Sequence, residues 1–173
     1  MKNKLTLAIL VLVAICIGQQ AKAQTASTTP VNLSIELQDA ISITLGGTPE
    51  VEFVYANAAD YAGSQTITKP AHFTVVSNQK YNITVNAVSA FTPSLDLDVV
   101  QISVASTTAP SIYGTGTLNT AVLSTTAASL VDNAIASKGA TYDIDYKIPD
   151  ATKLLGLTAG EYTTTVVYTA TQL

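Results

Sequence analysis

The chain contains few side chains that could catalyse a reaction or hold a metal. His72 is the only histidine and Cys16 the only cysteine, whereas a zinc site of the usual type needs three or four His or Cys ligands. A Ser-His-Asp triad would require a strained Gly-x-Ser-x-Gly turn, which the sequence lacks. The residues around His72 alternate as in a strand, so we expect His72 at the surface or half-buried. We therefore predict that the protein is not an enzyme and uses no metal or cofactor.

Two pairs of acids could carry chemistry if each pair shares one face of a strand. They are Asp96 with Asp98, and Asp143 with Asp145. Such pairs can bind Ca²⁺ or serve as the acid and base of a glycosidase, but no Asp-x-Asp-x-Asp-Gly loop supports calcium binding. Acids at this spacing more often form the solvated face of a strand or protect a sheet edge by their charge. We favour that structural interpretation.

Residues 1–23 have the pattern of a secretory signal peptide. Lys2 and Lys4 precede an apolar run at 5–17, and the small-x-small tripeptide AKA follows at 21–23. The run is shorter than the roughly 18–20 residues that a membrane span needs. We expect cleavage before Gln24 and export to the periplasm, the cell surface or the medium, with no stable membrane span after cleavage. Lipoprotein processing at Cys16 is the weaker alternative.

Removal of this leader makes the chain strongly acidic. Three of the eight basic residues lie in it and no acid does, which leaves five lysines, no arginine and twelve acids, a net charge of −7 instead of −4. Nucleic acids and anionic lipids bind to Lys/Arg patches, so we expect no nucleic-acid partner. The mature chain would also lack cysteine, and packing alone must stabilise it. Residues 24–173 have the length of one domain.

Alternating apolar residues predict an all-β fold. Period-two alternation marks about eight segments, at 31–37, 41–45, 51–55, 71–76, 81–88, 100–104, 142–148 and 162–170. The segments at 71–76 and 81–88 are separated by four turn residues, which predicts a β-hairpin. No long amphipathic helix is present to build a βαβ unit. We predict an immunoglobulin-like antiparallel β-sandwich.

The stretch at 106–140 is the least clear part of the pattern. Leu130, Val131, Ala134 and Ile135 have the spacing of one face of a short helix that would end near Gly139. A pair of strands explains the same residues nearly as well. The sequence leaves both alternatives open.

The most specific motif leads into the last strand. Leu157, Gly160 and Tyr162 match a tyrosine corner, in which a tyrosine after a tight turn donates its hydroxyl to a backbone group a few residues upstream. Gly160 would supply the turn, and Leu157 would fill the core beneath the ring. Val166 and Tyr168 continue the same face of the strand.

The chain ends about eleven residues after Tyr162, so we expect the sandwich to lack its terminal strand. An incomplete sandwich exposes unpaired backbone and core side chains. The candidate to fill the gap is an apolar comb formed by Val31, Leu33, Ile35 and Leu37. The comb could fold back as a strand of its own domain, or it could insert into the next molecule as a donor strand. Head-to-tail repetition of the second arrangement would build a filament.

Three further segments suggest a family. Phe53 with Tyr55, the segment KYNITV at 80–85 and the segment AGEYTTTVVY at 159–168 together resemble the spore coat U and archaic chaperone–usher pilin group. The resemblance covers most of the mature chain, and the last fifteen residues are its more specific part. It implies an incomplete immunoglobulin-like sandwich, self-association or association with other surface subunits, and assistance from a periplasmic chaperone.

Two functions follow from these patterns. In the first, the protein is an exported structural or adhesive subunit of a bacterial surface fibre or pilus-like assembly, and it polymerises by donating residues 31–37. In the second, it is a self-contained secreted binding module for a glycan or protein, with residues 31–37 paired in its own sheet and loops such as 106–116 making the contacts. A glycosidase that uses Asp96 or Asp143 is the least favoured interpretation.

Overall fold

The computed structural model of the chain describes residues 26–108 and 116–173, so the expected signal peptide lies outside the described residues. The chain divides into two parts, residues 1–36 and Leu37–Leu173. In the first part, residues 26–36 contain no helix or strand and are exposed. The second part contains every strand of the described chain and its hydrophobic core.

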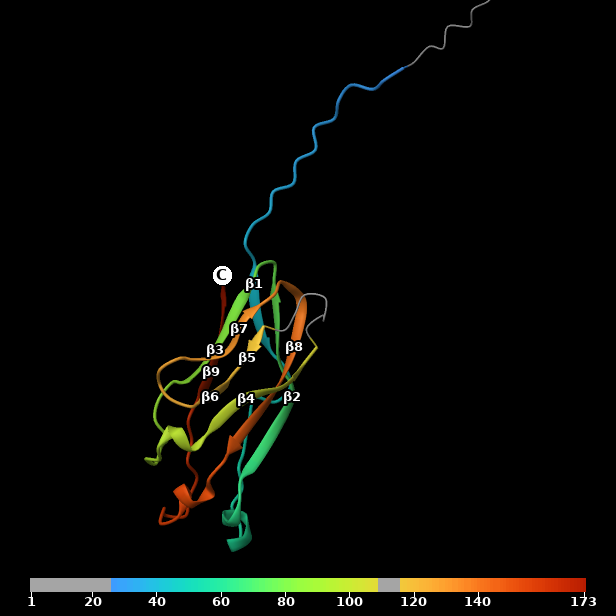
Figure 1. The fold of residues 1–173 in the computed structure, drawn as a ribbon. Helices are drawn as coiled ribbons and strands as arrows, with labels where there is room; N and C mark the ends of the chain where they lie inside the picture. Colours follow the sequence, from blue (N-terminus) through green and yellow to red (C-terminus); the bar gives the residue numbers. More distant parts are fainter. Residues whose placement is uncertain (1–25, 109–115) are drawn as a thin grey trace, which may run out of the picture. The chain divides into compact units, whose positions relative to one another are not determined.

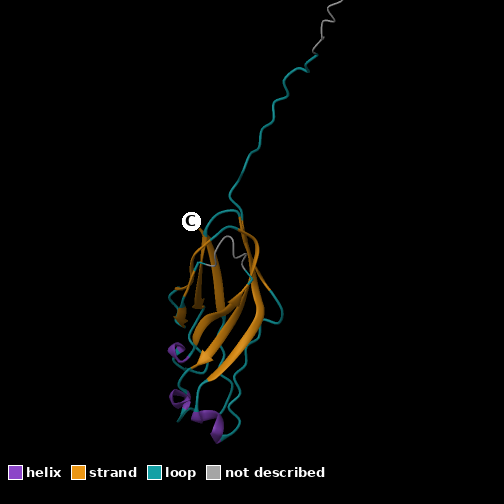
Figure 2. Ribbon diagram, turned by 45° about the vertical axis from the view of Figure 1, so that its right-hand side comes forward, coloured by secondary structure: helices purple, strands orange, loops and turns teal. Residues whose placement is uncertain are grey.

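The second part is a sandwich of two antiparallel sheets (Figure 1, Figure 2). The five-stranded sheet contains, in spatial order, β1 (Ile41–Leu45), β2 (Gln65–Ser77), β8 (Ser137–Ile148), β4 (Gln101–Thr107) and β6 (Thr120–Val122). The four-stranded sheet contains β5 (Thr117–Leu118), β7 (Ala128–Ala134), β3 (Tyr81–Ala87) and β9 (Val166–Gln172). The predicted all-β, immunoglobulin-like sandwich is therefore confirmed.

Three short 3₁₀ helices lie in the connections of the sandwich. They are η1 (Ala58–Ala62), η2 (Leu97–Val99) and η3 (Ala151–Leu154). Asn57 caps η1, because its side chain accepts from the backbone N–H of Ala59 while Asp60 accepts from the N–H of Asn57. Such reciprocal capping satisfies donors that a helix start leaves free.

The core forms where the inward faces of the two sheets meet. Burial alternates along β3 and β8, so that Tyr81, Ile83, Tyr142 and Ile144 are all inaccessible to solvent. The hydroxyls of Tyr81 and Tyr142 hydrogen-bond each other at 2.8 Å. This pair joins one sheet to the other and gives both buried hydroxyls a partner, which a buried polar group requires.

The predicted β-hairpin between 71–76 and 81–88 is wrong. β2 pairs with β1 and β8, whereas β3 pairs with β7 and β9 in the other sheet. The connection at 78–80 therefore crosses from one sheet to the other. A turn signal between two alternating segments is the same for a hairpin and for such a crossing, because both strands face one core.

The short helix considered near 130–135 is also wrong, and the alternative of a strand pair is right. Leu130 and Val131 are consecutive buried residues of strand β7. The register between β3 and β7 shifts between Ile83 and Thr84, and a β-bulge of this kind turns two successive side chains to one face. The bulge produced the helix-like spacing of apolar residues.

Gly46 provides a test of the packing where β1 ends. Its backbone N–H donates to the carbonyl of His72 at 2.8 Å, and a Cβ at this position would overlap the carbonyl oxygen of Ala71. We expect Gly46→Ala to lower the free energy of unfolding by about 1–3 kcal/mol, as overpacking does. Gly63→Ala is the matched control, because a Cβ there meets nothing within 4 Å, and it should change stability by less than about 0.5 kcal/mol. Urea unfolding of both variants measures the difference, and equal losses would contradict the close approach.

Candidate functional site

In the described structure, one side of the sandwich ends in two strands that each have a single neighbour. β1 is the last strand of the five-stranded sheet, and β9 is the last strand of the four-stranded sheet. The two strands contact each other across the sandwich. They run in opposite directions, because β1 is antiparallel to β2, β9 is antiparallel to β3, and the short connection at 78–80 reverses the chain between β2 and β3.

Half-exposed apolar side chains follow this pair of edges, and we call the region that they line the open seam. These side chains are Ile41 and Ile43 of β1, Val51, Phe53 and Tyr55 of the segment after it, and Val166, Tyr168 and Ala170 of β9. The inward residues of β3, the neighbour of β9, are buried, whereas every inward residue of β9 is only partly covered. The hydrophobic core is therefore incompletely buried along the seam.

The segment at 51–55 lies in the seam without being a strand. The predicted strand is wrong, because this segment pairs with no other strand of the described chain. The predicted alternation is present: Val51, Phe53 and Tyr55 are half-buried, and Glu52 and Val54 are exposed. Among the described residues, the one hydrogen bond found to this backbone comes from the Gln65 side chain, at 3.3 Å from the carbonyl of Val54. No strand of the described chain pairs with this segment, so its backbone is open to pairing.

A chain of hydrogen bonds forms the floor of the seam. The hydroxyl of Tyr168 donates to that of Tyr146 at 2.6 Å, and the Tyr146 hydroxyl lies 2.9 Å from Nε2 of His72. The three side chains come from β9, β8 and β2, so the chain spans both sheets. Burial raises the pKa of Tyr146 to about 12 and also raises the pKa of Tyr168. Both phenols therefore stay neutral and act as hydrogen-bonding groups.

His72 is buried, with 3% of its surface exposed, so its predicted position at the surface or half-buried is wrong. The register between β2 and β8 shifts between Lys69 and Phe73, and Ala71 has a φ of 46°. This irregularity turns His72 and Phe73 inward one after the other. In the described structure Nδ1 of His72 has no hydrogen-bond partner, which makes a charged imidazole costly there.

The tyrosine corner is present as a hydrogen bond. The hydroxyl of Tyr162 donates to the carbonyl of Thr158 at 2.8 Å. Gly160 lies in a bend, but the left-handed φ of this loop, +82°, belongs to Gly156. Leu157 is 38% exposed, so its predicted role as a core plug is wrong, and Leu154 of η3 packs against the core instead.

The predicted acid pairs serve structural contacts. Asp96 and Asp98 belong to the turn of η2 and not to a strand face, so their predicted placement is wrong. Asp143 and Asp145 do share the outward face of β8, where Asp143 accepts hydrogen bonds from Ser106 and from the N–H of Ala71. Among residues 26–108 and 116–173, no group of three or more His, Cys, Asp or Glu side chains could hold a metal ion.

The predicted donor and acceptor residues occupy different environments. Val166 and Tyr168 point inward from β9 at the seam, and Tyr162 lies just before that strand. The comb is exposed: Val31, Leu33, Ile35 and Leu37 have exposures of 78–88%, and no strand includes them. The predicted strand at 31–37 is therefore absent from the part of the chain that the structure describes.

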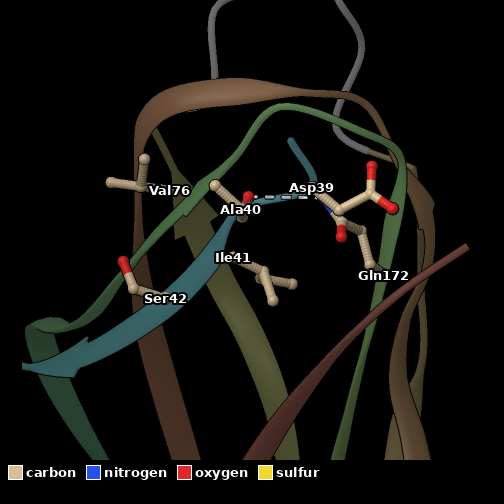
Figure 3. Close-up of a pocket in the computed structure, with 6 residues that line it drawn as sticks. All are labelled: Asp39, Ala40, Ile41, Ser42, Val76 and Gln172. Carbon is tan, nitrogen blue, oxygen red and sulfur yellow. Dashed lines mark hydrogen bonds between the residues drawn. The ribbon is translucent and has the colours of Figure 1, made fainter. Parts of the chain in front are cut away.

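A hollow marks the end of the seam where β9 finishes and β1 begins. Its volume is about 380 Å³, and its lining residues are Asp39, Ala40, Ile41, Ser42, Val76 and Gln172 (Figure 3). Sequence patterns did not identify Gln172 or its partner Asn78 as functional. Their only signal was the turn composition of residues 77–80, which does not reveal contacts with distant residues.

Comparisons with known proteins do not assign the chain to a family. No protein-family model matches it, and no curated protein matches it significantly. No helix in the part of the chain that the structure describes is long and apolar enough to cross a membrane. The open seam therefore has to be interpreted from its own geometry.

His72 predicts a pH dependence of stability. Burial, and to a smaller degree the charge of Lys69, holds its pKa below the ordinary value of 6.5. Below pH 6.5 the unfolded chain therefore binds a proton at His72 that the folded chain does not bind. The contribution of neutral His72 to the free energy of unfolding is complete above pH 6.5 and is lost as the pH falls toward the lower pKa of the folded state. The free energy of unfolding should change with pH by at most about 1.4 kcal/mol per pH unit through this one group. Urea unfolding between about pH 7.5 and pH 5.5 should show this loss, and His72→Gln should reduce it. An unchanged slope in the variant would refute this role for His72.

Tyr162 predicts an effect of one hydrogen bond on stability. Tyr162→Phe removes the hydrogen bond to Thr158 and should lower the free energy of unfolding by about 0.5–1.5 kcal/mol. Tyr61→Phe is the matched control, because the described structure gives the Tyr61 hydroxyl no hydrogen bond, and it should cost less than about 0.5 kcal/mol. Thermal and urea unfolding compare the two variants. Equal stabilities would mean that the tyrosine corner contributes nothing.

Proposed function

We propose that this protein is an exported structural or adhesive subunit of a bacterial surface fibre, which polymerises when the apolar comb of one molecule enters the open seam of the next. The observation that carries the proposal is the presence of both parts in one chain: an exposed apolar comb that belongs to no strand, and a seam whose backbone and side chains are incompletely covered. The comb has apolar side chains without cover, and the seam has apolar side chains and backbone groups that an added strand would cover.

The spacing of the two parts is compatible with strand addition. The comb residues recur every second position, and in an extended chain they all point to one face. Val166, Tyr168 and Ala170 recur in the same way along β9. A strand laid beside β9 could therefore pair its backbone with this edge while its apolar face covers the seam, as in β-augmentation.

The free energy available is of the right size. Burying a Val, Leu or Ile side chain contributes roughly 1.5–3 kcal/mol, so the four comb residues offer about 6–12 kcal/mol. Association of two molecules costs an estimated 4–15 kcal/mol in lost freedom. Backbone hydrogen bonds to β9 would add to the apolar term. Burial of the comb therefore contributes a free energy comparable to the cost of association, and we expect removal of the comb to abolish assembly.

The two edge strands carry none of the usual protection against pairing. Soluble proteins block edge strands with charged residues, proline or bulges. β1 reads ISITL and β9 reads VVYTATQ, so neither contains a charge or a proline. Such edges favour a pairing partner. The partner would be a second copy or another surface subunit, and a periplasmic chaperone would cover the seam before assembly.

The alternative of a self-contained binding module has less support. It requires residues 31–37 to form a strand of their own sheet, but no strand of the described chain includes them. We therefore favour donation between molecules over closure within one.

Charge placed on either face of the comb tests the proposal. Leu33→Asp with Ile35→Asp should abolish assembly, because burying two carboxylates in the seam is costly. Asn32→Asp with Ser34→Asp adds the same charge on the opposite face of the strand and should assemble nearly as the unmodified chain does. Sedimentation velocity and electron microscopy of the mature chain from Gln24 measure assembly. If both double variants assemble equally, strand donation is wrong.

Deletion and readdition of the comb give a second test. A chain without residues 24–37 should be monomeric and less stable than the assembled protein. A synthetic peptide of residues 29–39 should then raise its unfolding temperature in a saturable way, since a ligand that binds only the folded state stabilises it by mass action. The same peptide with aspartate in place of Leu33 and Ile35 should not. A deletion variant that matches the full chain in stability and oligomeric state would contradict the proposal.

A further inference from the structure

Side-chain amides fix the chain where it enters β1. Asn78 accepts a hydrogen bond from the N–H of Ala40 at 2.9 Å, and its amide nitrogen donates to the carbonyl of Gln38 at 2.7 Å. The backbone N–H of Asn78 also donates to the carbonyl of Ala40 at 3.1 Å. Gln172 donates to Oδ1 of Asn78 at 2.7 Å. It also donates to the carbonyl of Ala40 at 3.3 Å (Figure 3). We call these contacts between Asn78, Gln172 and residues 38–40 the amide latch.

The amide latch keeps residues 38–40 in line with β1. In an extended chain, the backbone groups of residues i and i+2 point to the same side. The carbonyl of Gln38 and both backbone groups of Ala40 face Asn78, so these residues continue the β1–β2 ladder beyond its pair of Ile41 with Ser77. The chain is therefore still extended at Gln38, directly after Leu37, the last residue of the comb.

A comb that closed on its own seam would need a reverse turn at this place. β1 and β9 run in opposite directions, and Gln172 at the end of β9 meets Ala40 just before the start of β1. For residues 31–37 to pair with β9 of the same molecule, residues 38–40 would have to form the turn. The amide latch holds those residues extended. The closed comb would also run parallel to β9, which is the slightly less stable arrangement per residue.

We infer that the amide latch prevents the comb from closing on its own seam and commits it to a second copy of this chain. Asn78 and Gln172 are then positioning residues for assembly. A short, held hinge disfavours the closed monomer and leaves exchange between molecules as the way to cover the seam. This inference rests on the proposed function and adds to it the reason why donation occurs between molecules.

Lengthening the hinge tests the inference while every latch residue stays in place. Insertion of Gly-Ser-Gly-Ser between Leu37 and Gln38 supplies a flexible turn. The mature chain with this insertion should be monomeric, and it should unfold at a higher temperature than the chain that lacks residues 24–37. The same insertion between Thr28 and Thr29, before the comb, is the matched control and should assemble as the unmodified chain does. Sedimentation velocity and thermal unfolding are the readouts.

A second change shows whether the monomer is closed. Leu33→Asp with Ile35→Asp, added to the hinge insertion, should lower the unfolding temperature of the monomer to that of the chain without residues 24–37. Asn78→Ala should raise the monomer fraction of the otherwise unmodified chain. Asn86→Ala is its control, because the Asn86 side chain bonds only the adjacent carbonyl of Ala87 in the described structure. If Asn78→Ala fails to fold, the insertion variant decides alone.

The outcomes separate this inference from the proposed function. An unmodified chain that assembles, together with a hinge insertion that assembles to the same extent, would overturn the role of the amide latch and leave strand donation standing. An unmodified chain that stays monomeric, with no effect of aspartates in the comb, would remove strand donation and this inference with it. Assembly of the unmodified chain and closure of the insertion variant would support both.

Discussion

In the described part of the chain, the backbone of β9 hydrogen-bonds to a neighbouring strand on one side only, and the other unusual features of the domain are connected with that edge. A sheet edge in water keeps its polar groups solvated but leaves the adjoining side chains half covered. Here the consequence extends around the border of the core, from Val166 and Tyr168 on β9 to Phe53 on the opposite edge. The sandwich is well packed at its centre and incompletely covered at one side, which is the surface that the proposed donor strand would cover.

Hydrogen-bonded aromatic side chains join the two sheets of a domain whose described residues contain no cysteine. Tyr81 with Tyr142 connects β3 to β8, and the chain from Tyr168 through Tyr146 to His72 connects β9, β8 and β2. Such links are directional and need hydroxyls that remain protonated, which burial ensures by raising the phenol pKa. They provide cross-sheet connections that do not depend on an oxidising environment, while the exposed part of the network lies at the seam itself.

Features that depend on near neighbours in the sequence could be predicted, and features that depend on distant ones could not. The alternation in β8 identified its buried face, and the hydroxyl of Tyr162 reaches a carbonyl four residues away, as its motif predicts. The choice of partner for β2 and β3 is not encoded locally, which is why a hairpin was expected where the chain crosses between sheets. The contacts of Asn78 with Ala40 and with Gln172 join residues 38 and 94 positions apart. Bulges explain two further errors, because at His72 and at Val131 they turn two successive side chains inward.

The amide latch also determines how the domain would respond to mechanical load. Tension applied along β1 through the residues before Gln38 would first strain the contacts made by Asn78. It would then pass to the five residue pairs between β1 and β2, from Ile41 with Ser77 to Leu45 with Phe73. Ladder hydrogen bonds lie perpendicular to the strand, so a pull along β1 loads these pairs together in shear and does not open them one at a time. A subunit joined to its neighbours through this segment would therefore resist extension at the strand where the comb begins.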